Sequence, residues 1–234
     1  SSVTLLELTR AYAVYPRGGE RVIPRFIERV VDRDGQELLA EAPLGPVPPP
    51  VLKPLLAEGE VEEESYPDSE ILPTPQLISP ADAYLMSDLL RAVVTEGTGR
   101  RLRRLGRTLA GKTGTTDNYT DAWFMGFSPE LTTGVWVGHD DNQRLGWGET
   151  GARAALPIWG DFMEVALAPY PQQDFEVPEN IEFQRVDRSS GLIADASTQD
   201  AYFQPFLSGT APERSFSDQS TSEESRRAAR EDIF

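Results

Sequence analysis

The chain has 234 residues, of which 39% are hydrophobic, and a formal net charge of −16. This apolar content supports a sizeable core, whereas the acidic balance disfavours general binding to nucleic acid or to an anionic membrane surface, since both need a basic excess. The lack of cysteine and the single histidine, His139, exclude disulfide frameworks, cysteine nucleophiles and multi-histidine zinc sites, so we expect no metal or cofactor. The sequence holds no apolar run of about eighteen residues that would span a bilayer. It opens on a polar helix start rather than a signal-like segment, from which we expect that the natural beginning has been removed.

A helix and a hairpin are the first predicted elements. Thr4 and Glu7 form a capping box, because each side chain can bond the backbone amide of the other residue, and this indicates a helix start. Residues 26–31 and 37–39 are strand-like and flank Asp34-Gly35, a turn signal, so they are expected to pair as a hairpin.

Residues 40–78 form a segment rich in proline and then in glutamate, for example Pro48-Pro49-Pro50 and Glu62-Glu63-Glu64. Each proline removes a backbone donor, so the segment is neither a helix nor a central strand. We interpret it as a solvated surface insertion, with docking of a partner as the alternative.

The second predicted helix starts at Ser79, an N-cap residue followed by proline, and ends at Gly97. Its expected apolar stripe is Leu85, Leu89 and Val93, with Met86, Leu90 and Val94 beside it. A basic run follows, consisting of Arg100, Arg101, Arg103, Arg104 and Arg107. It is either a solvated charged face or a means of attracting an anionic substrate to a neighbouring site.

Three consecutive antiparallel strands are expected at residues 108–116, 122–127 and 131–138. A last helix is expected to open at Pro157, with Ile158, Phe162 and Ala166 on one face and Trp159 and Met163 beside it. We therefore predict an α+β fold in residues 1–168, an antiparallel sheet flanked by helices.

The remaining residues change in character. Residues 169–216 are expected to be an appendage with a small hairpin, in which residues 181–186 pair with residues 192–194 across a Ser189-Ser190-Gly191 turn. Residues 217–234 contain mostly Ser, Glu and Arg and are expected to be disordered.

The strand at residues 108–116 carries the main candidate site. Alternation places Thr113 and Thr115 on one face, where two hydroxyls can hold a carboxylate. Lys112 points to the other face, but its flexible stem can bring a positive charge to the same cleft if the strand begins there. Gly114 allows another backbone to approach, so a peptide could add as an extra strand. An ordinary strand with an exposed lysine is the simpler alternative for these residues alone.

The surrounding motifs favour a more specific interpretation. Lys112-Thr113-Gly114-Thr115-Thr116, followed by Asp121-Ala122-Trp123-Phe124 and Gly134-Val135-Trp136-Val137-Gly138, resembles the end of the transpeptidase domain of class A penicillin-binding proteins, the bifunctional peptidoglycan synthases of bacteria. Glu96-Gly97-Thr98-Gly99, Ala155-Leu156-Pro157-Ile158-Trp159 and the run from Leu6 to Ala13 are similar to the same family. The resemblance runs in order from about residue 2 to residue 167. It is weaker in the C-terminal appendage.

The resemblance implies a serine acyltransferase of the penicillin-binding and serine β-lactamase fold. Such enzymes cross-link peptidoglycan stem peptides through an acyl-enzyme, and β-lactam antibiotics mimic the substrate. By position, Lys112 and Thr115 would be catalytic: Lys112 supports the proton relay electrostatically, and the Thr115 amide forms half of the oxyanion hole. Thr113, Gly114, Thr115 and Thr116 would bind the substrate, with the hydroxyls of Thr113 and Thr115 on its terminal carboxylate. The family is anchored in the bacterial inner membrane with its domains on the periplasmic side, where cell-wall synthesis partners would be met.

Two motifs of the family are missing. Ser-x-x-Lys, which carries the nucleophile, does not occur, because Leu109 and Pro50 stand three residues before Lys112 and Lys53. Ser-x-Asn does not occur either. We therefore expect the chain to be the C-terminal portion of a longer synthase, to depend on the missing N-terminal part, and not to acylate alone. The alternatives are a non-catalytic binding or scaffold module on the same fold, and a β-lactamase-like serine hydrolase.

Other residues carry weaker signals. His139 stands beside Asp140 and Asp141, which would suit a base or metal site, but such a group is more often a solvated loop. Trp123, Trp136 and Trp159 are expected in the core. Trp147, in a glycine-rich loop, is the tryptophan that could line a cleft.

Overall fold

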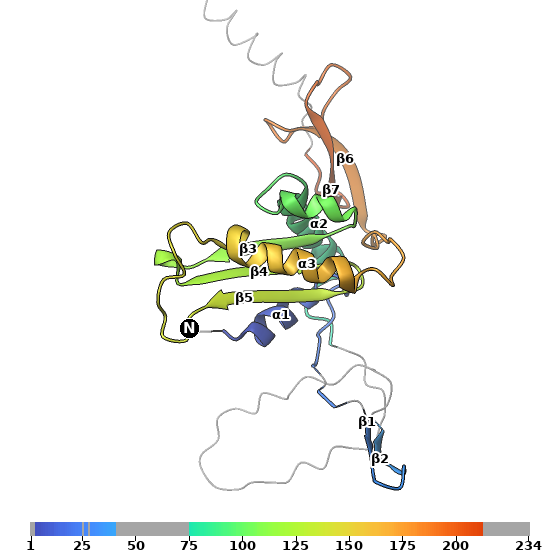
Figure 1. Ribbon diagram of the computed structural model, residues 1–234. Helices are drawn as coiled ribbons and strands as arrows, with labels where there is room; N and C mark the ends of the chain where they lie inside the picture. Colours follow the sequence, from blue (N-terminus) through green and yellow to red (C-terminus); the bar gives the residue numbers. More distant parts are fainter. Residues whose placement is uncertain (1–2, 25, 28, 41–74, 213–234) are drawn as a thin grey trace, which may run out of the picture.

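The computed structural model describes residues 3–24, 26–27, 29–40 and 75–212. A three-stranded antiparallel sheet lies at its centre, in the order β3 (Ala110–Thr115), β4 (Asp121–Phe127) and β5 (Thr132–Gly138). Helices α1 (Leu5–Ala13) and α3 (Leu156–Ala166) cover the sheet, and α2 (Pro80–Thr95) lies beside β3 (Figure 1). The predicted α+β class and the three strands are confirmed, with strand ends shifted by one or two residues.

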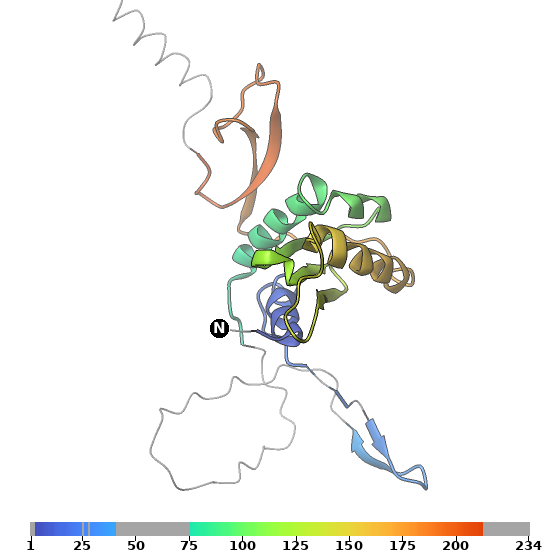
Figure 2. The same ribbon diagram turned by 60° about the vertical axis from the view of Figure 1, so that its left-hand side comes forward.

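The two faces of the sheet can be assigned from β5. A Cβ on Gly134 would collide with Thr9 and Leu5 of α1, so this side of the strand faces α1. The neighbouring Thr133 contacts α3 instead, because its hydroxyl lies 3.3 Å from the sulfur of Met163. Since side chains alternate along a strand, α1 and α3 lie on opposite faces (Figure 2).

Helix α1 begins as the sequence predicts. The Thr4 hydroxyl accepts the Glu7 amide at 3.2 Å, and the Glu7 carboxylate accepts the Thr4 amide at 2.8 Å. This reciprocal pair satisfies two amides that a helix start otherwise leaves without a partner.

Helix α2 also begins at its predicted cap, where the Ser79 hydroxyl accepts the Asp82 amide at 3.1 Å. Its predicted apolar face is wrong. Leu89 is 57% exposed, and the buried face instead contains Tyr84, Ser87, Leu90 and Val94. Ser87 interrupts the hydrophobic pattern of this face, but its hydroxyl donates to the Ala83 carbonyl at 2.8 Å and is thereby satisfied within the helix.

Helix α3 shows the same kind of difference. A single π-helical stretch, Gly151–Ala155, precedes it, and the helix then buries Trp159 and Met163. The predicted face is wrong, because Ile158 and Phe162 are 52% and 54% exposed. Trp159 decides the orientation: its ring packs against Phe124 at 5.1 Å between centroids, and its Nε1 donates to the Thr133 carbonyl at 2.9 Å.

The core connects these elements. Leu102, from the 3-10 helix η1 (Arg100–Leu105), packs with Leu109, Phe124, Trp159 and Met163 into one buried cluster. A short 3-10 turn, η2 (Asp117–Tyr119), joins β3 to β4.

Two separate hairpins complete the described chain. β1 (Arg29–Val31) pairs with β2 (Glu37–Ala40), so the strand predicted at residues 26–31 starts later than expected. β6 (Ile181–Asp187) pairs with β7 (Ala201–Leu207). The predicted pairing of residues 192–194 with β6 is present as an isolated antiparallel bridge from Ile193 to Val186, in which the Asp187 amide donates to the Leu192 carbonyl at 2.8 Å and the Ala194 amide donates to the Arg185 carbonyl at 2.8 Å. The longer partner, β7, was not predicted.

Most of the proline-glutamate segment and the tail predicted to be disordered lie outside the described residues. Within the described ranges, no helix has the length and hydrophobicity needed to cross a membrane. No group of three or more metal-binding side chains occurs there either.

Candidate active site

The candidate site follows β3, which is an edge strand of its sheet (Figure 1). Thr113 pairs with Phe124 and Thr115 pairs with Ala122, and the Thr116 amide donates to the Asp121 carbonyl at 3.2 Å. In an antiparallel pair, hydrogen-bonded and non-hydrogen-bonded positions alternate. The amides and carbonyls of Thr113 and Thr115 therefore point away from β4, toward the free edge of the sheet.

Lys112 brings a positive charge to this edge. Its side chain starts on the α1 face, because Lys112 pairs with Met125, whose side chain lies against Gly134 on that face. Its Nζ nevertheless donates to the outward-facing Thr113 carbonyl at 2.8 Å. In the part of the chain that the structure describes, no carboxylate forms an ion pair with Lys112. The Lys112 ammonium therefore lies at the outward-facing backbone of β3.

The Thr113 hydroxyl lies 3.1 Å from the hydroxyl of Thr98, in the loop between α2 and η1. A hydroxyl has one proton and can accept two hydrogen bonds. If Thr98 donates in this pair, the Thr113 proton is free for a ligand.

The Thr115 hydroxyl has a different partner. It accepts the Gly151 amide at 3.0 Å, and Gly151 lies directly on the sheet. A Cβ at position 151 would lie 2.5 Å from the Gly114 carbonyl oxygen and 3.1 Å from the Gly114 nitrogen. Only glycine allows this approach. The bond uses an acceptor site of Thr115 and leaves its proton available.

Thr116 belongs to the turn that closes β3. Its hydroxyl donates to Asp121 Oδ2 at 3.0 Å and accepts the Asp121 amide at 2.9 Å. Trp136 Nε1 donates to Asp121 Oδ1 at 2.8 Å. These bonds, that from Trp136 foremost, hold the pKa of Asp121 below its ordinary value by stabilising the charged form. The Thr116 hydroxyl is thus engaged in fixing the end of the strand.

Sequence reasoning missed Thr98, Gly151 and Asp121 as supporting residues. Thr98 and Asp121 belong to two of the motifs that resemble the family. No local sequence pattern, however, predicts the contact between the hydroxyls of Thr98 and Thr113. Gly151 stands 36 positions after Thr115, and only the folded chain brings the two residues together.

Two arginines of the basic run before β3 bind the last helix and the residue that follows it. Arg104 binds Asp161 at 2.7 Å and also pairs with Glu164, both on α3. Arg107 donates to the Leu167 carbonyl at 2.9 Å. These two arginines join η1 and the start of β3 to the last helix.

The tryptophans and the histidine that carried weaker sequence signals differ in how far they are exposed. Trp159 is fully buried as expected, whereas Trp136 is 37% exposed, so its core prediction is wrong. Trp147 is 87% exposed and packs edge-to-face on Tyr119 at 5.8 Å. His139 is exposed.

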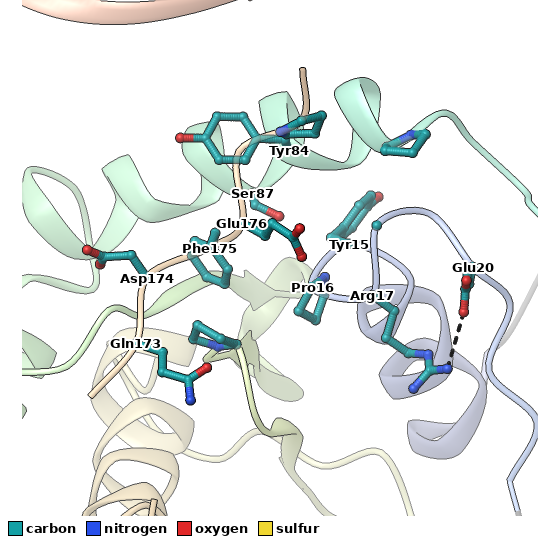
Figure 3. Close-up of a pocket in the computed structure, with 14 residues that line it drawn as sticks. Tyr15, Pro16, Arg17, Glu20, Tyr84, Ser87, Gln173, Asp174, Phe175 and Glu176 are labelled. Carbon is teal, nitrogen blue, oxygen red and sulfur yellow. Dashed lines mark hydrogen bonds and ion pairs between the residues drawn. The ribbon is translucent and has the colours of Figure 1, made fainter. Parts of the chain in front are cut away.

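A cavity of about 610 Å³ lies elsewhere, between the end of α1, the first half of α2 and residues 173–178 (Figure 3). Tyr15, Tyr84 and Phe175 supply its aromatic lining, and Glu20, Asp174 and Glu176 supply its carboxylates. None of Lys112, Thr113 or Thr115 lines it. The candidate site is therefore an open strand edge and not this cavity.

Residues 1–164 match the family described as penicillin binding protein transpeptidase domain. The chain belongs to this family of transpeptidase domains.

Among the proteins to which the chain is similar, two are penicillin-binding proteins 1A. The chain is 41% identical over 217 residues to penicillin-binding protein 1A of Aquifex aeolicus, covering 92% of the chain and 26% of that protein. It is 37% identical over 234 residues to penicillin-binding protein 1A of Pseudomonas aeruginosa, covering 91% of the chain and 28% of that protein.

A crystal structure of a penicillin-binding protein 1A also has the same fold as this chain. Penicillin-binding protein 1A from Haemophilus influenzae superposes with a TM-score of 0.76 and 31% identity, over 92% of this chain and 33% of that chain. The resemblance to class A penicillin-binding proteins is confirmed. The chain spans about a quarter to a third of the length of these relatives.

Proposed function

We propose that this chain supplies the substrate-binding strand of a peptidoglycan D,D-transpeptidase, within a longer class A synthase. The observation that carries the proposal is the free edge of β3, to which the amides of Thr113 and Thr115 point and at which the Lys112 ammonium lies. A stem peptide adds along this edge as an extra strand, with its main chain paired to β3.

The terminal carboxylate of the peptide is bound by the hydroxyls of Thr113 and Thr115. The Thr115 hydroxyl can donate, because Gly151 engages it as an acceptor, and the Thr113 hydroxyl can donate when Thr98 is the donor of their shared bond. The two charge-assisted hydrogen bonds fix the end of the peptide and thereby the position of the carbonyl that reacts.

In the acylation step, a serine oxygen attacks the penultimate D-alanine carbonyl and the C–N bond to the terminal D-alanine breaks. The developing oxyanion accepts a hydrogen bond from the outward-facing Thr115 amide, which is held in place before the reaction. The released amine takes up the proton that the serine gives up. The Lys112 ammonium favours this transfer through its charge. Gly114 lets the substrate backbone approach, and Thr116 contributes through the turn that it holds.

The serine lies outside this chain, which contains no Ser-x-x-Lys. We infer that the rest of the synthase supplies it, together with an anchor in the inner membrane, so that the site faces the periplasm. β-Lactams compete for the same strand edge, because they carry a carboxylate next to a reactive carbonyl.

Labelling by a fluorescent penicillin tests the proposal. The full-length synthase should be labelled, and this chain alone should not. Lys112→Ala in the full-length protein should slow labelling by about a hundredfold, the scale of losing one preorganised stabilising group at an oxyanion site. Arg101→Ala removes an exposed positive charge on η1 and serves as the matched control, with labelling close to wild type.

Labelling of this chain by itself would contradict the proposal, since it would place a nucleophile within the sequence. Equal labelling of the wild type and Lys112→Ala would remove Lys112 from the site. No labelling of the full-length protein would favour a non-catalytic binding module.

A further inference from the structure

The loop after α2 is folded tightly against the end of that helix. The Gly97 amide donates to the Ala92 carbonyl at 3.0 Å, and the Gly99 amide donates to the Val93 carbonyl at 2.9 Å. A Cβ on Gly97 would lie 2.9 Å from Val93 Cα, and one on Gly99 would lie 3.1 Å from the Val93 carbonyl oxygen. The two glycines therefore hold Thr98, which stands between them, on the last turn of α2.

From this loop Thr98 reaches the substrate strand, where its hydroxyl lies 3.1 Å from that of Thr113. Each hydroxyl has only one proton. When Thr113 donates to a ligand carboxylate, it can keep its bond to Thr98 only by accepting the Thr98 proton. Such a chain of donors strengthens the final bond, because each hydroxyl polarises the next.

The same loop is attached to the C-terminal hairpin. Arg188, directly after β6, donates through Nη1 to Glu96 Oε2 at 2.8 Å, and Glu96 stands two residues before Thr98. The guanidinium is fixed from the hairpin side as well: it lies 4.5 Å from the ring centroid of Tyr202, and its Nε lies 3.3 Å from Asp200 Oδ1. Figure 1 shows the hairpin beside α2.

We propose that Thr98 is a positioning residue for Thr113, and that Arg188 of the C-terminal hairpin anchors the loop that presents Thr98. The hairpin thus tunes the binding of carboxylate-bearing ligands without contacting them. This inference rests on the proposed function, because it requires Thr113 to bind the carboxylate.

The expected effects are modest and differ between the two residues. Loss of one hydrogen bond should weaken ligand binding by about two- to tenfold. Loss of an exposed ion pair such as Arg188–Glu96 should weaken it by up to about fivefold.

The test uses the full-length synthase with a fluorescent penicillin and with the methyl ester of the same penicillin, which lacks the carboxylate charge. Acylation rates over a range of concentrations separate the dissociation constant of the first complex from the acylation rate constant. The variants are Thr98→Val, Thr98→Ser and Arg188→Ala, with Arg101→Ala as a control that removes another exposed arginine.

For the penicillin, Thr98→Val should raise the dissociation constant by about two- to tenfold with little change in the acylation rate constant, and Thr98→Ser should restore it. Arg188→Ala should raise it by about 1.4- to fivefold, and Arg101→Ala should not change it. For the ester, all variants should match the wild type.

Three results would overturn the inference. If Thr98→Val binds penicillin as the wild type does, Thr98 does not position Thr113. If Arg188→Ala binds penicillin as the wild type does, the hairpin does not influence ligand binding. Equal weakening toward penicillin and ester would show general damage to the fold. A different result would refute the proposed function instead: a wild-type protein that binds penicillin and ester equally well has no carboxylate subsite.

Discussion

Gly151 offers a sharp test of how β3 is held, because the chain cannot tolerate a side chain there. In Gly151→Ala the new Cβ would lie 2.5 Å from the Gly114 carbonyl oxygen, and it would also collide with the Trp123 carbonyl oxygen. Both atoms belong to the backbone of the sheet, so neither can rotate away. The π-helical stretch must move off the strand, and the bond from the Gly151 amide to the Thr115 hydroxyl at 3.0 Å is lost.

The magnitude follows from these two effects. Overpacking of this kind costs about 1–3 kcal/mol, and the lost hydrogen bond adds about 1 kcal/mol. The overpacking lowers the free energy of unfolding, whereas the lost bond removes the positioning of Thr115, so we expect the rate of penicillin acylation in the full-length synthase to fall by about fivefold.

The assay is the rate of labelling by fluorescent penicillin, measured together with thermal unfolding. Gly18→Ala is the matched control. Gly18 has a φ of 65° and open space around the position of a Cβ, so alanine strains the backbone there without a collision. That strain costs about 1–2 kcal/mol. Acylation by Gly151→Ala at the same rate as Gly18→Ala would refute the claim that Gly151 positions Thr115.

Two further predictions concern the turn of β3 and the face of α2. Because the pKa of Asp121 is lowered in the folded protein, its stabilising effect is complete above the ordinary aspartate value of about 3.9 and is lost as the pH falls through the folded value. The indole N–H signal of Trp136, followed by NMR, should therefore titrate with a midpoint below that of an ordinary aspartate and should not titrate in Asp121→Asn; a midpoint at or above the ordinary value would contradict the assignment. On α2, Leu90→Ala should lower the free energy of unfolding by about 2–5 kcal/mol, whereas Leu89→Ala, at a 57% exposed position, should change it by about 0.5 kcal/mol or less. Urea unfolding of the two variants checks this order, and equal losses would mean that the buried face is assigned wrongly.

The sequence was sufficient to predict the central sheet and the helix starts. Strand-like runs joined by a short turn signal marked β4 and β5, small residues with alternating threonines marked β3, and the side chains of Thr4 and Ser79 marked two helix caps. These features form between residues that are close in the sequence, so the sequence alone can predict them.

The buried faces of α2 and α3 could not be predicted in the same way. α2 buries Ser87, which a hydrophobic pattern counts against the correct face. α3 is apolar on more than one side, and the contact of Trp159 with Phe124 and Thr133 selects among the sides only in the folded chain. Only the short bridge of β6 to residues 192–194 was predicted, and its longer partner β7 was not; the loop between them is held by bonds from Arg185 to the carbonyls of Asp195 and Thr198.

In the candidate site, too, local sequence predicted some residues, whereas others depend on tertiary contacts. Lys112, Thr113 and Thr115 were predicted from one strand and its neighbouring motifs. Their supports, Thr98 and Gly151, come from a loop before the strand and a π-helical stretch after it. Such supports depend on tertiary contacts that no local pattern specifies.

A crystal structure of the full-length synthase acylated by a penicillin would test the central claim most directly. The account predicts the penicillin carboxylate within about 2.5–3.2 Å of the Thr113 and Thr115 hydroxyls, and the acyl carbonyl oxygen within that distance of the Thr115 amide. A penicillin carboxylate bound away from both threonines, or an acyl oxygen facing away from the Thr115 amide, would contradict it.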